Sequence, residues 1–320
     1  MAYKKQKLST PEKLGISIGG GYLSLAWIES GQAMAGPILK GCFQAPCVQI
    51  TDGVKILTEW VETNHLKNID TVFVLEPTKY NLYLLEEPEV EEKELNSALR
   101  WRVKDYLDYE IDSAVVDYIP LPGKRTGEGK KMGYAIAVNQ KNVDEGVQLI
   151  EASGLQVLAI DIAETALRNV GQCIKEHEEG IVYLHIAPKS SQLILIKKGI
   201  IYLMRKVDIN AQFLFDNKEG DAQKEEIYKE RFVNDLVLEV QRSIDYCSST
   251  LRQNPAKKLV IGPLPKNIED LIAKIQENLG MPVQAADFKE FLQCHKPVSP
   301  LDQNRCVYAI GGALRREVVT

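Results

Sequence analysis

Apolar and polar residues alternate with two different periods along the chain, and the changes of period predict where strands give way to helices. Short apolar runs predict buried strands near residues 14–18, 22–28 and 36–43. Apolar residues at helical spacing then predict a helix over 52–65, and a further apolar run predicts a strand over 71–75. The same order of elements recurs near residues 181–187, 191–197, 200–206, 228–252 and 257–262. The sequence thus predicts two copies of one unit in the α/β class.

A different pattern separates the two copies. Residues 91–109 predict an amphipathic helix, two apolar runs near 114–120 and 132–138 predict a hairpin, and residues 141–153 predict a second helix. This α+β stretch of roughly 75 residues has the size of a small domain. We therefore expect four segments: part of the first half at 1–85, an insertion at 86–158, a connecting helix at 159–178 that completes the first half, and the second half at 179–320.

The C-terminal segment "VYAIGGALRRE" (307–317) predicts a helix that contains two adjacent glycines, Gly311 and Gly312. In an isolated helix each glycine costs ~1 kcal/mol relative to alanine. The pair therefore indicates that another backbone packs closely against this helix.

Composition and charge exclude several classes of function. The net charge of the 320 residues is −5, so no global basic surface predicts binding to nucleic acid. The basic start "MAYKKQK" lacks the apolar run of a secretory signal, and no apolar stretch reaches the ~18 residues of a membrane span. The six cysteines and four histidines show no ligand-like spacing, so we expect no metal site. The expected location is the cytoplasm.

Four segments carry a family resemblance through their order and spacing. They are "ALRWRVKDYLDYEIDSAVVDYIPLP" (98–122), "LEVQRSIDYCSSTL" (238–251), "NLGMPVQ" (278–284) and "YAIGGALRR" (308–316). Together they resemble the PilM/MshI family, the actin-like cytoplasmic proteins of type IV pilus assembly, and the MSHA-type branch is the more similar. The resemblance runs from Lys13 to about Arg316. It implies an actin-like fold, with two ribonuclease H-like halves and a small insertion in the first half.

The resemblance also implies a function and a partner. Proteins of this family lie on the cytoplasmic face of the inner membrane, where they bind the short N-terminal tail of a single-span PilN-like protein. They help to couple the pilus platform to cytoplasmic motor ATPases. PilM itself binds ATP between its two halves, so the nucleotide loops of this chain decide whether ATP and Mg²⁺ are expected here.

The first nucleotide loop departs from the family pattern. PilM-like proteins have roughly "GIDIGSSSVKL", whereas residues 15–25 here are "GISIGGGYLSL". Ser17 replaces the aspartate that orients metal-bound water, and a serine lacks the negative charge that holds Mg²⁺. The backbone N–H groups of Gly19, Gly20 and Gly21 can still bind an anion. The simpler interpretation is that these glycines form a hairpin turn.

The second and third loops depart further. In "LHIAPKSSQL" (184–193), His185 replaces the family's acid and Pro188 removes an N–H donor. We expect His185 to be a neutral histidine at a strand end, with a pH-dependent phosphate ligand as the alternative. In "VIGPLPKNIED" (260–270), only Gly262 remains of the glycines on the adenosine side.

One part of the family's nucleotide site is better preserved. Glu239 and Arg242 lie on one flank of the helix predicted over 228–252, and in the wider superfamily this helix contributes an acid and a basic residue to ribose and adenine. The alternative is an ordinary i,i+3 ion pair, which is worth a few tenths of a kcal/mol.

The predicted function is therefore a non-catalytic scaffold of a type IV, MSHA-like pilus, with no enzymatic turnover and no required cofactor. One alternative is an ATP-binding conformational switch of the same family. A second is a sugar or metabolite kinase, for which Asp161 is the candidate catalytic acid; we favour a structural role for Asp161 at a helix start. A third is the cytoplasmic domain of a type II secretion L-type protein, against which the lack of a predicted span argues.

The partner site is predicted around the helix over 91–109. Trp101 lies on the face opposite to the apolar stripe formed by Leu95, Leu99, Val103 and Tyr106, with Arg102 beside it. Either the main domain covers this tryptophan or it contacts the partner's tail, since Trp and Arg are favoured binding anchors. Glu87 and Glu91 lie just upstream and would attract the basic residues of such a tail. We expect the groove between the insertion and the first half.

Overall fold

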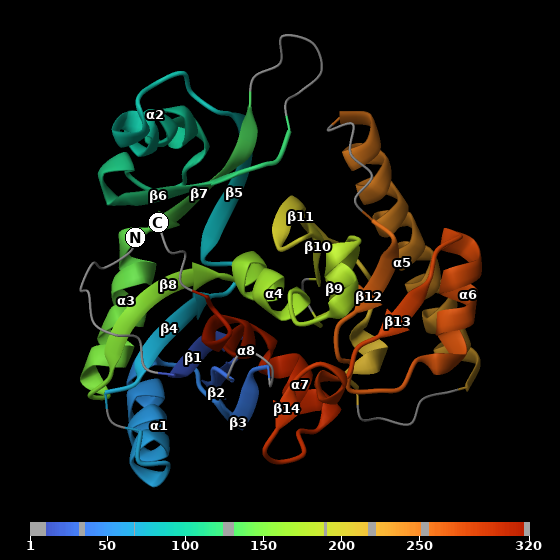
Figure 1. Cartoon of the computed structure of the whole chain (residues 1–320), viewed down its shortest axis with the longest axis horizontal. Coiled ribbons are helices and arrows are strands. Elements are labelled where there is room, and N and C mark those ends of the chain that lie inside the picture. The colour runs from blue at the N-terminus through green and yellow to red at the C-terminus, as the bar shows by residue number, and fades with distance from the viewer. Residues whose placement is uncertain are drawn as a thin grey trace.

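The computed structural model of the chain describes residues 11–31, 36–66, 68–123, 131–188, 191–216, 222–250 and 256–316. These residues form two large β-sheets and one small sheet, with helices packed on and between them (Figure 1). The strand orders are β14-β3-β2-β1-β4-β8 in the first sheet, β11-β10-β9-β12-β13 in the second and β5-β7-β6 in the small one.

The first sheet joins an antiparallel meander to parallel strands. Its strands are β1 (Glu12–Gly19), β2 (Tyr22–Glu29), β3 (Ile38–Pro46), β4 (Asp70–Leu75), β8 (Gln156–Ile162) and β14 (Gln293–Cys294). Strands β1 to β3 are antiparallel, whereas β4 runs parallel to both β1 and β8. Helices α1 (Ile50–Thr63) and α3 (Gln140–Ala152) bury Leu57, Leu149 and Ile150 against this sheet.

The second sheet repeats the same order of elements. Strands β9 (Ile181–His185), β10 (Ser191–Lys197) and β11 (Ile200–Val207) are antiparallel, and β12 (Lys258–Ile261) and β13 (Val283–Ala285) are parallel additions. Helices α5 (Ala222–Thr250) and α6 (Glu269–Leu279) complete the unit. The predicted internal duplication is confirmed.

Two helices lie between the large sheets. Helix α4 (Ala163–Gly171) contacts β8 of the first sheet and β10 of the second, and α8 (Val307–Ala313) packs across α4 and β1. A Cβ atom on Gly311 would lie 2.2 Å from the backbone oxygen of Ala166, and one on Gly312 would lie 2.7 Å from the Val74 side chain. The close approach predicted from the glycine pair is confirmed, because any larger residue at 311 would collide with backbone.

The small sheet differs from the predicted insertion in two ways. Its strands are β5 (Tyr80–Glu86), β6 (Ala114–Pro120) and β7 (Met132–Asn139), and α2 (Glu92–Val103) covers one face. Strand β5 was not predicted, and it pairs with β7 although its residues were expected in the first half. The helix expected over 91–109 ends at Val103 and continues as a 3₁₀ turn, Lys104–Tyr106. Leu107 and Ile111 then turn into the small core, and Tyr106 is 67% exposed rather than buried.

The C-terminal segment returns to the first sheet. Strand β14 pairs with β3. The predicted last helix is α8, and a helix that was not predicted, α7 (Pro300–Arg305), precedes it. Residues expected in the second half thus supply one strand and one packed helix to the first half. Within the described residues, no helix combines the length and apolar character needed to cross a bilayer.

Candidate functional site

The first glycine corner joins β1 to β2 as a tight hairpin. Gly19 pairs with Tyr22, and Gly20 (φ 59°) and Gly21 (φ 85°) adopt the left-handed conformation that glycine tolerates best. Among the described residues, apart from the neighbours of each glycine in sequence, no atom lies within 4 Å of the space where a Cβ on Gly20 or Gly21 would stand. Ser17 and Ser24, the positions of the family's aspartate and lysine, face each other across the hairpin and are buried. The corner therefore presents backbone without the charged side chains of the family pattern.

An acid that the sequence analysis missed lies against this corner. A Cβ atom on Gly19 would come within 2.3 Å of Glu76 Oε2, so this carboxylate sits directly beside the glycine backbone. Thr78 holds the carboxylate in place by donating its hydroxyl to Glu76 Oε1 at 2.7 Å. A carboxylate in this place repels phosphate. Glu76 directly follows β4, and β4 is the parallel neighbour of β1. An acid at the end of the predicted strand over 71–75 could therefore have been expected beside the glycine corner.

The second corner is built around a buried histidine. His185 ends β9 and is 2% exposed, and its ring makes an edge-on contact with Tyr308, with 5.1 Å between centroids. Burial lowers the pKa of His185 to about 3, so the ring is neutral at physiological pH. The expectation of a neutral histidine at a strand end is confirmed. Lys189 and Ser190, part of the corner expected from the sequence, lie outside the described residues.

The third corner follows β12. The Gly262 N–H donates to the Leu184 carbonyl at 2.8 Å, and a Cβ on Gly262 would be 3.0 Å from Tyr183 Oη. Because Gly262 has no side chain, its backbone can pack closely against β9. The next carbonyl, that of Pro263, accepts a hydrogen bond of 2.8 Å from Asn304.

Glu239 and Arg242 form the pair that helical spacing predicts. Arg242 Nη1 lies 3.1 Å from Glu239 Oε1, and Arg205 on β11 donates to the other oxygen, Oε2, at 2.9 Å. Ser243 also donates to the Glu239 carbonyl. Both carboxylate oxygens are therefore paired with arginines of the protein, which supports the interpretation as an ordinary ion pair.

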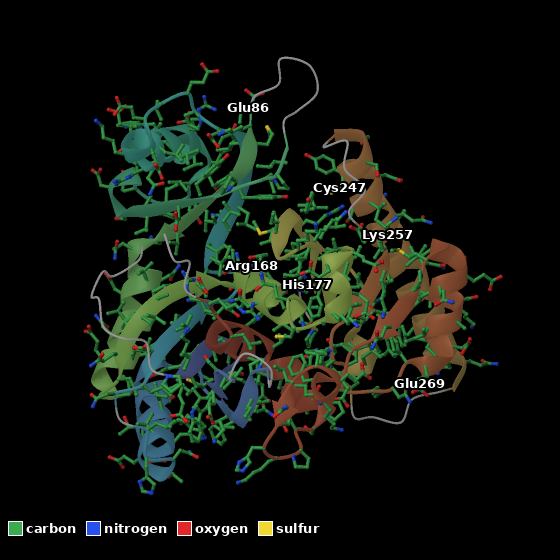
Figure 2. The ribbon with its side chains drawn as sticks, viewed as in Figure 1. Glu86, Arg168, His177, Cys247, Lys257 and Glu269 are labelled. Carbon is green, nitrogen blue, oxygen red and sulfur yellow. The ribbon has the colours of Figure 1, made fainter. Side chains whose placement is uncertain are left out.

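Asp161, the candidate catalytic acid of the kinase alternative, forms an ion pair with Arg315. It lies in β8, is 7% exposed and accepts a hydrogen bond from Arg315. Glu164, in the first turn of α4, is also buried, and Tyr80 donates its hydroxyl to Glu164. Burial raises the pKa of Glu164. Figure 2 shows Arg168 of the same helix between the two large sheets.

A groove of about 560 Å³ opens where β5 leads into α2. It is formed by the connection after Glu86, which is labelled in Figure 2, by the first turns of α2 and by the adjoining ends of β6 and β7. Its lining comprises Glu87, Pro88, Val90, Glu92, Leu95, Asn96, Asp117, Tyr118, Pro120 and Lys131. All of these belong to the small sheet, its helix and the segments that connect them. The groove is therefore not located between the insertion and the first half, where the sequence analysis expected one.

The groove is lined by both apolar and acidic side chains. Tyr118 lies flat against β7 because Gly133 has no side chain; a Cβ there would be 2.2 Å from Tyr118 Cζ. Burial and the neighbouring Glu87 carboxylate raise the pKa of Tyr118 to about 12, so its hydroxyl stays protonated. Three acids, Glu87, Glu92 and Asp117, face one lysine, Lys131, whose Nζ lies 3.6 Å from Glu87 Oε1. The excess of acids favours a cationic ligand.

The predicted partner residues are only partly brought together. Arg102 donates to the Glu86 carbonyl at 2.9 Å, so Arg102 and Glu87 share the β5–α2 corner. Glu91 precedes α2 and pairs with Lys93 at the surface. Trp101 is absent from the groove lining; it is 67% exposed, with Lys104 Nζ 5.2 Å from its ring centroid. The interpretation that the main domain covers Trp101 is wrong, since the side chain points outward from α2.

No protein-family model matches the chain, and no curated protein matches it in sequence. Solved structures do match. A chain of a PilM–PilN type IV pilus biogenesis complex superposes with a TM-score of 0.68 at 19% identity, covering 94% of this chain and 97% of that one. A Bacteroides thetaiotaomicron protein with an actin-like ATPase fold and unknown function gives a TM-score of 0.50 at 9% identity, covering 89% and 93%.

These likenesses define the class of the protein: the chain has an actin-like fold of the kind seen in PilM. The actin-like fold that the family resemblance implied is thus confirmed. At these identities the likeness concerns the fold alone. Among the described residues, no group of three or more His, Cys, Asp or Glu side chains is arranged to hold a metal ion.

Proposed function

We propose that this chain is a cytoplasmic scaffold of type IV pilus assembly, of the MSHA-like branch, that binds the N-terminal cytoplasmic tail of a PilN-like membrane protein. The tail would hold the chain at the cytoplasmic face of the inner membrane, where it would couple the platform to a motor ATPase. The observation that carries the proposal is the match in fold to the PilM–PilN complex, which extends over nearly the whole of both chains.

The groove at the β5–α2 corner supports a tail of mixed character. The side chains of Val90, Leu95 and Tyr118 offer apolar contacts, while Glu87 and Glu92 offer charge to lysine or arginine. In the PilM/MshI family, which this chain resembles, the bound tails are short and contain both apolar and basic residues. We place the tail in this groove, with Arg102 and Glu91 at its edge and Trp101 as an outer contact of the same partner.

The nucleotide loops support a scaffold rather than an enzyme. Ser17 supplies no carboxylate for Mg²⁺, Glu76 lies beside Gly19 where phosphate would approach, and His185 is buried and neutral. The alternative, an ATP-binding switch, is favoured by one observation: the open space beside Gly20 and Gly21 leaves their backbone accessible.

Two calorimetric titrations test the proposal. The purified chain is titrated with a synthetic PilN-like tail and separately with Mg·ATP. We expect micromolar binding of the tail and no heat from ATP up to millimolar concentration. Micromolar ATP binding would establish the switch in place of the nucleotide-free scaffold. No binding of the tail would contradict the partner assignment.

Charge variants locate the tail. Glu87→Gln combined with Glu92→Gln removes two acids from the groove, and Lys131 then loses its ion pair with Glu87. We expect about tenfold weaker binding of the tail, because the interaction between opposite charges is lost. Glu277→Gln, an exposed acid on α6, is the matched control and should leave the affinity unchanged. An equal affinity in the double variant would exclude this groove.

A further inference from the structure

Helix α7 joins the first sheet through one of its faces. Gln44 on β3 donates to Asp302 Oδ1 at 3.0 Å and accepts from Arg305 Nη1 at 2.9 Å. Ser24 on β2 donates its hydroxyl to the Arg305 carbonyl at 3.1 Å. The Arg305 guanidinium also lies over the Tyr22 ring, 4.2 Å from its centroid. Residues 302 and 305 are one turn apart, so a single face of the helix makes all of these contacts.

The residues between them bind the second half. Asn304 is 3% exposed and donates both hydrogens of its amide, to the Ile186 carbonyl at 2.9 Å and to the Pro263 carbonyl at 2.8 Å. Gln303, which is 1% exposed, accepts from the Phe288 N–H at 2.9 Å and donates to Asp287 Oδ1, also at 2.9 Å. Two buried amides thus face one half while Asp302 and Arg305 face the other.

The two carbonyls bound by Asn304 belong to adjacent corners. Ile186 follows β9 and Pro263 follows β12, and these strands are parallel neighbours, so their ends lie side by side. The Gly262 N–H donates to the Leu184 carbonyl at the same place. Asn304 therefore ties together the ends of β9 and β12 with a side chain whose donors are both used.

We propose that α7 is a built-in clasp. It holds the second and third corners of the second half against β2 and β3 of the first half, using protein donors alone. The relative position of the two large sheets at this junction is then set by α7 and does not depend on a nucleotide. Asn304 is the positioning residue of the clasp, because it alone bonds to both corners among the described residues of α7.

Hydrogen–deuterium exchange of the full chain tests the clasp. Asn304→Asp keeps the shape of the side chain but replaces its two donors with oxygen, which faces two carbonyls. We expect the Gly262 amide to exchange about tenfold faster, because the ends of β9 and β12 lose their shared donor. Asn278→Asp is the matched control: Asn278 donates within its own helix, to the Lys274 carbonyl, and Gly262 should exchange there as in the wild type.

A second variant addresses the other face of the clasp and remains decisive if Asn304→Asp does not fold. Ser24→Ala combined with Gln44→Ala removes the three hydrogen bonds that Ser24 and Gln44 form with α7, and the Cys306 amide should then exchange about tenfold faster. In the wild type, millimolar Mg·ATP should leave exchange at Gly262 unchanged. Wild-type exchange at Gly262 in a folded Asn304→Asp protein, wild-type exchange at Cys306 in the double variant, or slowing by ATP would each overturn the proposal.

Discussion

The Arg205 guanidinium lies 2.9 Å from Glu239 Oε2, so an ion pair joins strand β11 to the middle of helix α5. Glu239 is 8% exposed, and its other oxygen pairs with Arg242, whose side chain is 59% exposed. The acid is thus shared by one partly buried cation and one surface cation. The two pairs should differ in energy, because solvent screens the outer pair far more than the inner one.

Replacement of each arginine separates these two contributions. Arg205→Ala leaves a buried carboxylate with only an exposed partner, and we expect the free energy of unfolding to fall by about 1–3 kcal/mol. Arg242→Ala should lower it by no more than about 0.5 kcal/mol. Urea unfolding of both variants measures the difference. Equal losses in the free energy of unfolding would show that the Arg205–Glu239 pair stabilises the fold no more than the Arg242–Glu239 pair.

Gly311 offers a test of the helix crossing between the sheets. Gly311→Ala puts a methyl group 2.2 Å from the Ala166 carbonyl oxygen, and α4 or α8 must shift to accept it. We expect a loss of about 2–3 kcal/mol in the free energy of unfolding. The matched control is Gly41→Ala, whose added Cβ meets its nearest atom, in the Trp60 ring, at 3.5 Å. If both variants are equally stable, the crossing is looser than the structure indicates.

The sequence predicted the fold well where the signal was local. Periodicity located the strands around the glycine corner and the long helix α5, and Gly311 predicted a close crossing before its partner, Ala166, was known. Strand β5 was missed because its pairing partner, β7, begins 46 residues after β5 ends, and its residues are mostly half-buried. The end of α2 was missed because it depends on Leu107 and Ile111 entering a core built by other strands.

The candidate site was less predictable, since its key contacts are distant in sequence. Asn304 binds carbonyls 118 and 41 residues away, and nothing in its neighbourhood marks it as different from any polar helical residue. The groove lining was predicted only at Glu87, because Tyr118 and Lys131 reach the same corner only through the pairing of β6 with β7. Trp101 was more predictable, because helical geometry alone places it on the face of α2 opposite the apolar stripe.

Trp101 also gives a prediction on partner binding. Its side chain is 67% exposed, so Trp101→Ala should change the free energy of unfolding by less than about 0.5 kcal/mol. If Trp101 is an outer contact of the partner, the same variant should bind the PilN-like tail about tenfold more weakly in calorimetry. Tyr228→Ala, at an exposed position on α5, is the control and should retain full affinity. Unchanged binding by Trp101→Ala would remove Trp101 from the site.

His185 should make the stability of the protein depend on pH. Burial lowers the pKa of His185 to about 3 in the folded chain, whereas an unfolded histidine has a pKa of about 6.5. Between these values the unfolded state binds a proton that the folded state does not. The stability contributed by the neutral ring is therefore complete above pH 6.5 and falls as the pH drops toward 3, by about 1.4 kcal/mol per pH unit.

His185→Phe isolates this effect, because phenylalanine keeps a ring against Tyr308 but does not titrate. Urea unfolding is measured at pH 7.0 and pH 5.5 for both proteins, and each is compared only with itself, so a change in absolute stability does not matter. Between these two pH values the wild type should lose about 1 kcal/mol more than the variant. Identical losses would mean that the pKa of His185 is the same in the folded and unfolded chain, so that the second corner would gain a positive charge as the pH falls below about 6.5.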